Sequence, residues 1–167
     1  MIKEENRRLV FDQKDREFSY RVGALLYREG KLLMRKIKGA ERYILPGGYP
    51  EWGENSKVAL ARCLLEQSGA AVMVGRLCIL AELFFGIEKS RHQLQPIFLA
   101  ELKNSNALPK ETFPAYDSLG QPMEEEEFCW VEPERLEQAQ VLPRCIRPYL
   151  KELPDYVIHL QDREERL

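Results

Sequence analysis

The residues best suited to chemistry in this 167-residue chain gather between positions 45 and 70. This segment opens with Leu-Pro-Gly-Gly at positions 45–48 and leads through a short acidic stretch into apolar residues at helical spacing. A glycine-rich turn that leads into a helix exposes backbone N–H groups, and the helix dipole adds positive potential, so an anion such as phosphate is favoured there. By itself, such a turn is also compatible with a plain strand-to-helix connection.

The helix that follows has a recognisable beginning and end. Asn55 is suited to the N-cap, because its side-chain oxygen accepts an N–H of the first turn. Gly69 is suited to the position after the last turn, because glycine tolerates a left-handed conformation. Between these limits, Cys63, Glu66 and Gln67 share one face, since residues three and four apart are neighbours on a helix.

The spacing of the segment resembles the box of the Nudix hydrolase family, whose MutT-like members share the pattern Gly, five residues, Glu, seven residues, then Arg-Glu-apolar-x-Glu-Glu-x-Gly-apolar. Here Gly48 is followed after five residues by Glu54, and after seven more by Arg62; Gly69 and Ala70 then complete 23 residues. The strand pattern on both sides extends the resemblance over about residues 18–153. Further residues that look like Nudix sequences are Leu45, Pro46, Gly47, Glu51 and Gly53.

Two box carboxylates are replaced in this chain. Cys63 follows Arg62 where the family has Glu, and Gln67 stands in the family's Glu-Glu pair after Glu66. A thiolate is a soft ligand and an amide oxygen is neutral, whereas Mg²⁺ prefers charged oxygen ligands. Two unit charges about 4 Å apart interact by roughly 4 kcal/mol at an effective dielectric near 20, so each lost carboxylate matters. The box is therefore degenerate.

The resemblance implies a divalent cation, Mg²⁺ or Mn²⁺, and we expect its binding to be weak. The oxygen ligands left for it are Glu66, Glu54, Glu51 and the Gly48 carbonyl. The resemblance further implies that Glu66 is catalytic, with Glu82, or Glu88 beside it, replacing the lost base. The residues that it implies for substrate binding are Gly47, Gly48, Arg62 in an orienting role, and Trp52.

Several of these residues also have a structural interpretation. Glu54 and Arg62 can form an ion pair that fixes the loop on the helix. Cys63 has no histidine near it in sequence, which favours an unreactive thiol. His92 is compatible with a surface histidine, and it is followed by Gln93 where some relatives have Glu. Four aromatic residues are suited to stacking on a base, although aromatics on strands more often pack in cores: Phe84, Phe85, Tyr116 and Trp130.

The remaining chain predicts a mixed α/β sandwich, which the resemblance makes a Nudix-type α/β/α sandwich with a mixed central sheet. Helices are expected at 56–68, at 133–139 and at about 143–153, the last kinked by Pro148. Strands are predicted at 20–27, 31–36, 43–45, 75–85, 95–102 and 128–131.

Three segments lie outside this pattern. Residues 1–17 form an N-terminal arm or short strand before the domain at 18–153, and residues 154–167 form a C-terminal tail. The stretch between Leu102 and Phe128 contains three prolines and a glycine, which is compatible equally with a lid or binding loop and with disorder.

Composition narrows the possible partners. The chain has 25 Lys and Arg against 27 Asp and Glu, a net charge of −2, so it lacks the basic excess that duplex nucleic acid requires. No apolar stretch approaches the roughly 20 residues needed to span a bilayer, and the polar start is unlike a secretory signal. Four scattered cysteines without a Cys-x-x-Cys pair predict reduced thiols and a cytoplasmic protein.

Three functions remain open from the sequence. The first is a hydrolase that cleaves a diphosphate linkage in a nucleoside diphosphate derivative, with activity weakened by the box substitutions. The second is an inactive module of the same fold that binds a nucleotide-type small molecule. The third is a structural subunit whose cleft has lost its role; here the resemblance is also compatible with a homodimer. Fold alone does not decide between them.

Overall fold

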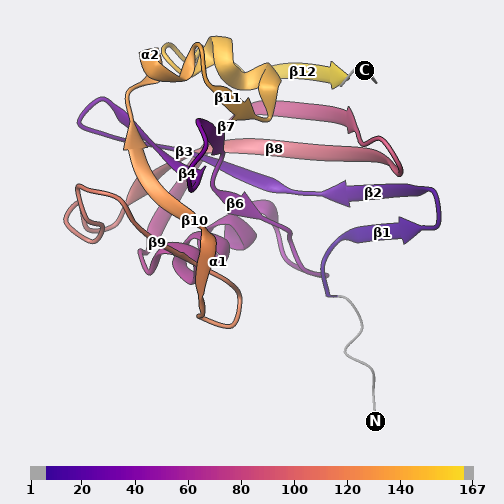
Figure 1. Ribbon diagram of the computed structural model, residues 1–167, viewed down its shortest axis with the longest axis horizontal. Helices are drawn as coiled ribbons and strands as arrows, with labels where there is room; N and C mark the ends of the chain where they lie inside the picture. The colour runs from indigo at the N-terminus through magenta and orange to yellow at the C-terminus, as the bar shows by residue number, and fades with distance from the viewer. Residues whose placement is uncertain (1–6, 164–167) are drawn as a thin grey trace.

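The computed structural model describes residues 7–163, in which the strands join into one mixed sheet with helical segments on both sides (Figure 1). The main path through the sheet is β1-β2-β8-β3-β4-β10-β9, and the mixed character predicted from the sequence is confirmed. The strands are β1 (Val10–Gln13), β2 (Arg16–Tyr20), β3 (Val22–Arg28), β4 (Lys31–Ile37), β5 (Arg42–Ile44), β6 (Gly47–Gly48), β7 (Val72–Phe85), β8 (Ser90–Leu102), β9 (Phe113–Tyr116), β10 (Pro122–Val131), β11 (Gln140–Leu142) and β12 (Ile158–Arg163).

Strands β3 and β4 are buried on both faces and separate two apolar cores. Successive side chains of a strand point to opposite faces, so Leu25 of β3 packs in one core and its neighbour Leu26 in the other. The first core lies under the C-terminal helical segments and includes Leu136 and Ile146. The second core lies under the helix that follows the box turn, α1 (Ser56–Ser68), and includes Leu60. This two-sided burial is what makes the fold a sandwich.

Helix α1 (Ser56–Ser68) has the limits that the sequence predicts. The Asn55 side chain accepts hydrogen bonds from the backbone N–H groups of Lys57 and Val58, both at 3.1 Å. Gly69 ends the helix with φ of 76°, and its N–H donates to the Leu65 carbonyl. The caps hold the box helix at a fixed length against the second core.

The helical layer on the other side is thinner than predicted. Helix α2 (Pro133–Leu136) ends before the expected residue 139, and the chain continues into β11. In place of the helix predicted at about 143–153 stands a 3-10 helix, η1 (Arg144–Tyr149), because Pro148 has no N–H for an α-helical bond. Within residues 7–163, no helix is long and apolar enough to cross a bilayer.

The stretch between Leu102 and Phe128 is largely folded onto the sheet. It forms β9 and extends β10 back to Pro122, so the acidic run at 124–127 lies within a strand. Its first part is held by Arg28, which donates to the carbonyls of Leu108 at 2.8 Å and Pro109 at 2.7 Å. Amino-acid composition does not reveal such contacts to main-chain carbonyls. They favour an ordered segment over a disordered one among the described residues.

The two terminal segments each add a strand, at opposite edges of this part of the sheet (Figure 1). The N-terminal segment forms β1, which pairs with β2. Its backbone also binds the box loop, residues 49–55 between β6 and α1, since Trp52 N–H donates to the Arg7 carbonyl at 3.0 Å. The C-terminal segment, expected as a tail, contains β12, which pairs in parallel with β7. Residues 1–6 and 164–167 of the expected arm and tail lie outside the described residues.

Candidate functional site

Arg62 holds the box loop against α1. Its Nε and Nη2 bind the two carboxylate oxygens of Glu54 at 2.8 and 2.9 Å, so the ion pair expected from the sequence is present. Nη2 also donates to the Tyr49 carbonyl at 3.1 Å, and Nη1 lies 3.2 Å from Glu66. The Glu51 N–H donates to Glu54 at 3.0 Å. One guanidinium therefore fixes both ends of the loop and one helix carboxylate.

The charges in this network reinforce each other. The hydrogen bond from Arg62 lowers the pKa of Glu54 below its ordinary value of 4.5, although burial opposes the shift. The same contact raises the pKa of Arg62. Both groups are therefore charged at neutral pH, and Glu54 has its two oxygens committed to the loop rather than to a ligand.

Glu54→Gln is expected to lower the free energy of unfolding by about 2 kcal/mol, because it removes charge-assisted hydrogen bonds from a partly buried pair. Since the pKa of Glu54 is depressed in the folded state, its contribution is present above pH 4.5 and is lost as the pH falls through the folded pKa. Urea unfolding at pH 7 and pH 3 measures this. The exposed Glu132→Gln is the control, and an equal loss in both variants would contradict the prediction.

The two replaced box residues face the glycine turn. Cys63 is buried, and a Cβ added to Gly48 would lie only 2.5 Å from its Sγ. Burial raises the pKa of the Cys63 thiol, which fits an unreactive packing residue. The Gln67 amide donates from Nε2 to the Gly47 carbonyl at 2.8 Å. The positions of the two lost carboxylates are therefore occupied by packing and by a hydrogen bond.

The donors at this turn do not fit a dedicated site for the divalent cation that the resemblance implies. Within residues 7–163, no three His, Cys, Asp or Glu side chains gather as a cation site. Glu54 and Glu66 both contact Arg62, and Cys63 offers a buried thiol. The buried oxygen of Gln67, which has no hydrogen-bond partner, is neutral. A hard cation is offered little charge here.

Glu82, expected as a replacement base, lies on β7 and contacts histidines. One oxygen lies 2.9 Å from His92 Nε2, and the other lies 3.7 Å from His159 Nε2 and 3.3 Å from Gln161 Nε2. The hydrogen bond with His92 lowers the pKa of Glu82. Glu88 is exposed in the turn after β7. The described contacts connect Glu82 to β8 and β12 and not to α1, so its catalytic role remains a prediction.

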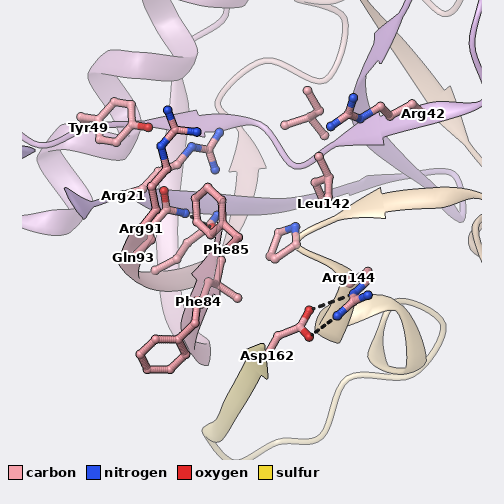
Figure 2. Close-up of a pocket in the computed structure, with 14 residues that line it drawn as sticks. Arg21, Arg42, Tyr49, Phe84, Phe85, Arg91, Gln93, Leu142, Arg144 and Asp162 are labelled. Atoms are coloured by element: carbon pink, nitrogen blue, oxygen red, sulfur yellow. Dashed lines mark hydrogen bonds and ion pairs between the residues drawn. The ribbon is translucent and has the colours of Figure 1, made fainter. Parts of the chain in front are cut away.

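A cavity of about 350 Å³ lies beside the box loop (Figure 2). Tyr49, the residue after Gly48, lines it together with side chains from β5, β7, β8 and the start of η1. Figure 2 shows Tyr49, Arg21, Arg91 and Phe85 gathered at one side of the cavity and Arg42 at the other. The cavity therefore combines cationic groups with an aromatic wall.

The expected binding residues are distributed unevenly around this cavity. Gly47 and Gly48 form β6 beside it, paired with β3. Trp52 is 68% exposed and packs edge-on against Phe11, 6.0 Å between ring centroids, and it does not line the cavity. Of the four aromatic residues considered for base stacking, Phe84 and Phe85 line the cavity and Tyr116 and Trp130 do not.

Sequence reasoning named Gln93 but missed the other polar residues of the cavity. Arg91, Gln93 and Gln95 alternate along β8, and this spacing of two puts all three on the cavity face of the strand. That alternation was the available signal. Arg21 and Arg42 have no comparable signal, because each reaches the cavity only through the pairing of strands distant in sequence.

Comparison with known protein families identifies the family of this chain. The model of the NUDIX domain matches residues 17–153. The chain belongs to the Nudix family. Nudix proteins typically act on nucleotide-type substrates with a divalent cation. This Nudix chain has Cys63 and Gln67 at two positions where the family pattern has Glu. No curated protein matches its sequence closely enough to add more.

Solved structures similar to this Nudix chain agree in fold at low identity. A mutator MutT protein from Bacillus halodurans is 14% identical, with 86% of this chain and 88% of that one covered and a TM-score of 0.64. A NUDIX hydrolase from Nitrosomonas europaea is 18% identical, with 87% and 78% covered and a TM-score of 0.58. An ADP-ribose pyrophosphatase from Streptococcus suis is 12% identical, with 86% and 98% covered and a TM-score of 0.54.

Proposed function

We propose that this Nudix protein binds a nucleoside diphosphate derivative and hydrolyses its diphosphate linkage slowly. The observation that carries the proposal is the adjacency of the box turn and the arginine-lined cavity, since Gly48 ends the turn and Tyr49 lines the cavity. A phosphate held at the turn thus has cationic side chains and Phe85 within one hollow. The likeness in fold to an ADP-ribose pyrophosphatase is consistent with such a substrate.

Within this proposal each box residue has a defined task. Gly47 and Gly48 let the turn lie close against β3 and α1, because a Cβ at either position would meet protein atoms there, and this fixes the turn that the ligand contacts. Arg62 orients the loop and holds Glu66, the helix carboxylate that accepts a proton from the attacking water. With Glu66 as the proton acceptor, the oxygen donors left for Mg²⁺ or Mn²⁺ are Glu51 and the Gly48 carbonyl, which would hold the cation weakly. The exposed ring of Trp52 is available to stack on the ligand's base.

A second candidate is a nucleotide-binding module without chemistry. The contact that favours it is the hydrogen bond from Gln67 Nε2 to the Gly47 carbonyl, because it fills the turn from within the chain. Buried Cys63 beside Gly48 removes a second charged group from the same place. Both candidates share the cavity and differ only in turnover.

An assay with ADP-ribose, oxidised and normal nucleoside triphosphates and dinucleoside polyphosphates separates these candidates. With Mg²⁺ or Mn²⁺, we expect turnover of at least one substrate below about 1 per second. Glu66→Gln should reduce it about tenfold or more, whereas the exposed control Glu134→Gln should not. Binding without turnover would select the module. Neither binding nor turnover at millimolar ligand would reject both.

A further inference from the structure

The cavity concentrates positive charge in a chain whose net charge is negative. Four of the residues that line it are arginines, while Asp162 is its acidic residue and is paired with Arg144 at 2.8 Å. Arg91 lies 3.7 Å from Glu17 at the rim. Within residues 7–163, no carboxylate forms an ion pair with Arg21 or Arg42. The positive potential of the cavity is therefore only partly neutralised by the protein.

Arg21 is the most constrained of these cations. It occupies the break between β2 and β3, is partly buried, and donates from Nη2 to the Leu45 carbonyl at 3.1 Å. Burial, followed by repulsion from Arg35, lowers the pKa of Arg21 to about 10, so it stays charged at neutral pH. The nearby carboxylate of Glu126 is paired with Arg35 and acts on Arg21 only at longer range. An anion in the cavity would therefore offset the cost of withdrawing the Arg21 cation from water.

A buried amide that lines the same cavity carries a second donor. Ser19 Oγ donates to Gln93 Oε1 at 3.2 Å, and Gln93 Nε2 donates to Gln95 Oε1 at 3.0 Å. This relay leaves Gln95 Nε2 as its free end, and that nitrogen has no hydrogen-bond partner although Gln95 is only 1% exposed. Gly23 leaves room for it, since a Cβ there would lie 2.8 Å from Nε2. A buried donor without a partner requires an acceptor.

We infer that the cavity binds the phosphate groups of its ligand directly through Arg21 and Gln95, with Arg42 and Arg91 at its rim, and without a divalent cation. The inference rests on the proposed function, which supplies a ligand with a diphosphate. Arginine matches phosphate because its planar guanidinium offers two parallel N–H donors. Cys63 and Gln67 offer too little negative charge to hold a divalent cation. The arginines of the cavity supply the positive charge that such a cation would otherwise bring to the phosphates.

Calorimetric titration of the full chain with ADP-ribose tests the inference. In EDTA we expect measurable binding, and an excess of Mg²⁺ should change Kd by less than about threefold. Inorganic pyrophosphate should compete with ADP-ribose, and adenosine, which lacks phosphate, should not. Raising the salt concentration should weaken binding, because the arginines at the rim of the cavity are partly exposed and salt screens their attraction for phosphate.

Variants assign the binding to the named residues. Arg21→Met and Gln95→Met should each weaken binding in EDTA about tenfold or more, since each loses a buried hydrogen bond to a charged group. Arg21→Lys keeps the positive charge but loses the two parallel N–H donors of the guanidinium. Its affinity for ADP-ribose should therefore lie between those of Arg21→Met and the natural chain. The control is Arg135→Met, an exposed arginine on α2 that does not line the cavity. Thermal melting of each variant verifies that it is folded.

The outcomes separate this inference from the proposed function. Binding that appears only with Mg²⁺, or that is unchanged by the Arg21 and Gln95 variants, would overturn the direct phosphate site and leave the hydrolase intact. Absence of both binding and turnover would overturn the proposed function with it. Binding in EDTA that the two Met variants weaken, and that pyrophosphate displaces, would establish the site.

Discussion

Restoring both box carboxylates, Cys63→Glu/Gln67→Glu, is expected to make the stability of the chain depend on Mg²⁺ and to raise its turnover with Mg²⁺. At present Gln67 donates to the Gly47 carbonyl at 2.8 Å, and a carboxylate there would face the carbonyl oxygen instead. The second new carboxylate would enter the buried place of Cys63 beside Gly48. Uncompensated negative charge at this turn is destabilising, and a divalent cation would offset it.

In EDTA the double variant should melt roughly 5–10 °C below the natural chain, which corresponds to a loss of a few kcal/mol for a domain of this size. Added Mg²⁺ should recover most of that difference and leave the natural chain unchanged, because only a folded state with a formed site gains from the ion. Turnover of ADP-ribose with Mg²⁺ should rise about 100-fold or more. Differential scanning fluorimetry and a phosphate-release assay measure both effects.

The matched control adds the same charge to the same helix away from the turn. Val58 and Leu65 are both about half exposed on α1, so Val58→Glu/Leu65→Glu should show no dependence on Mg²⁺. A natural chain that is stabilised by Mg²⁺ as strongly as the double variant would show that other ligands already form a cation site. In that case the substitutions at positions 63 and 67 would not be what weakens the box.

Gly47→Ala is expected to lower the free energy of unfolding by about 4 kcal/mol or more. Gly47 has φ of 152°, and a Cβ there would lie 1.9 Å from the Val22 carbonyl oxygen. The obstacle is backbone of β3, which pairs with β6, so it cannot rotate away as a side chain would. Strain of 1–3 kcal/mol from the dihedral angle adds to roughly as much from overpacking.

Gly53→Ala is the control for this effect, because Gly53 also has positive φ, 81°, in the same loop, but a Cβ there meets nothing within 4 Å. Its cost should be only about 1 kcal/mol, from the left-handed conformation alone. Urea unfolding of the two variants gives the comparison. Equal stability of Gly47→Ala and Gly53→Ala would mean that the close approach of β6 to β3 does not limit this turn.

The helix of the box was determined by local sequence. Asn55 and Gly69 set its ends because capping depends on hydrogen bonds within a single turn, which neighbouring residues fix by themselves. The spacing from Gly48 to Arg62 predicted the family, since it places a turn and a helix face at fixed distances along the chain. Local signals were weaker for η1, where Pro148 stands inside the expected helix and the chain takes the tighter 3-10 form.

The cavity was decided by tertiary structure alone. Arg21, Arg42 and Gln95 lie far apart in sequence and meet because β8 pairs with both β2 and β3 and because β5 packs at the opposite rim. Strand register depends on which distant apolar faces are buried together, so it has no signature within any one segment. The sequence thus determined the box and its missing carboxylates, and the tertiary structure decided that uncompensated arginines lie next to it.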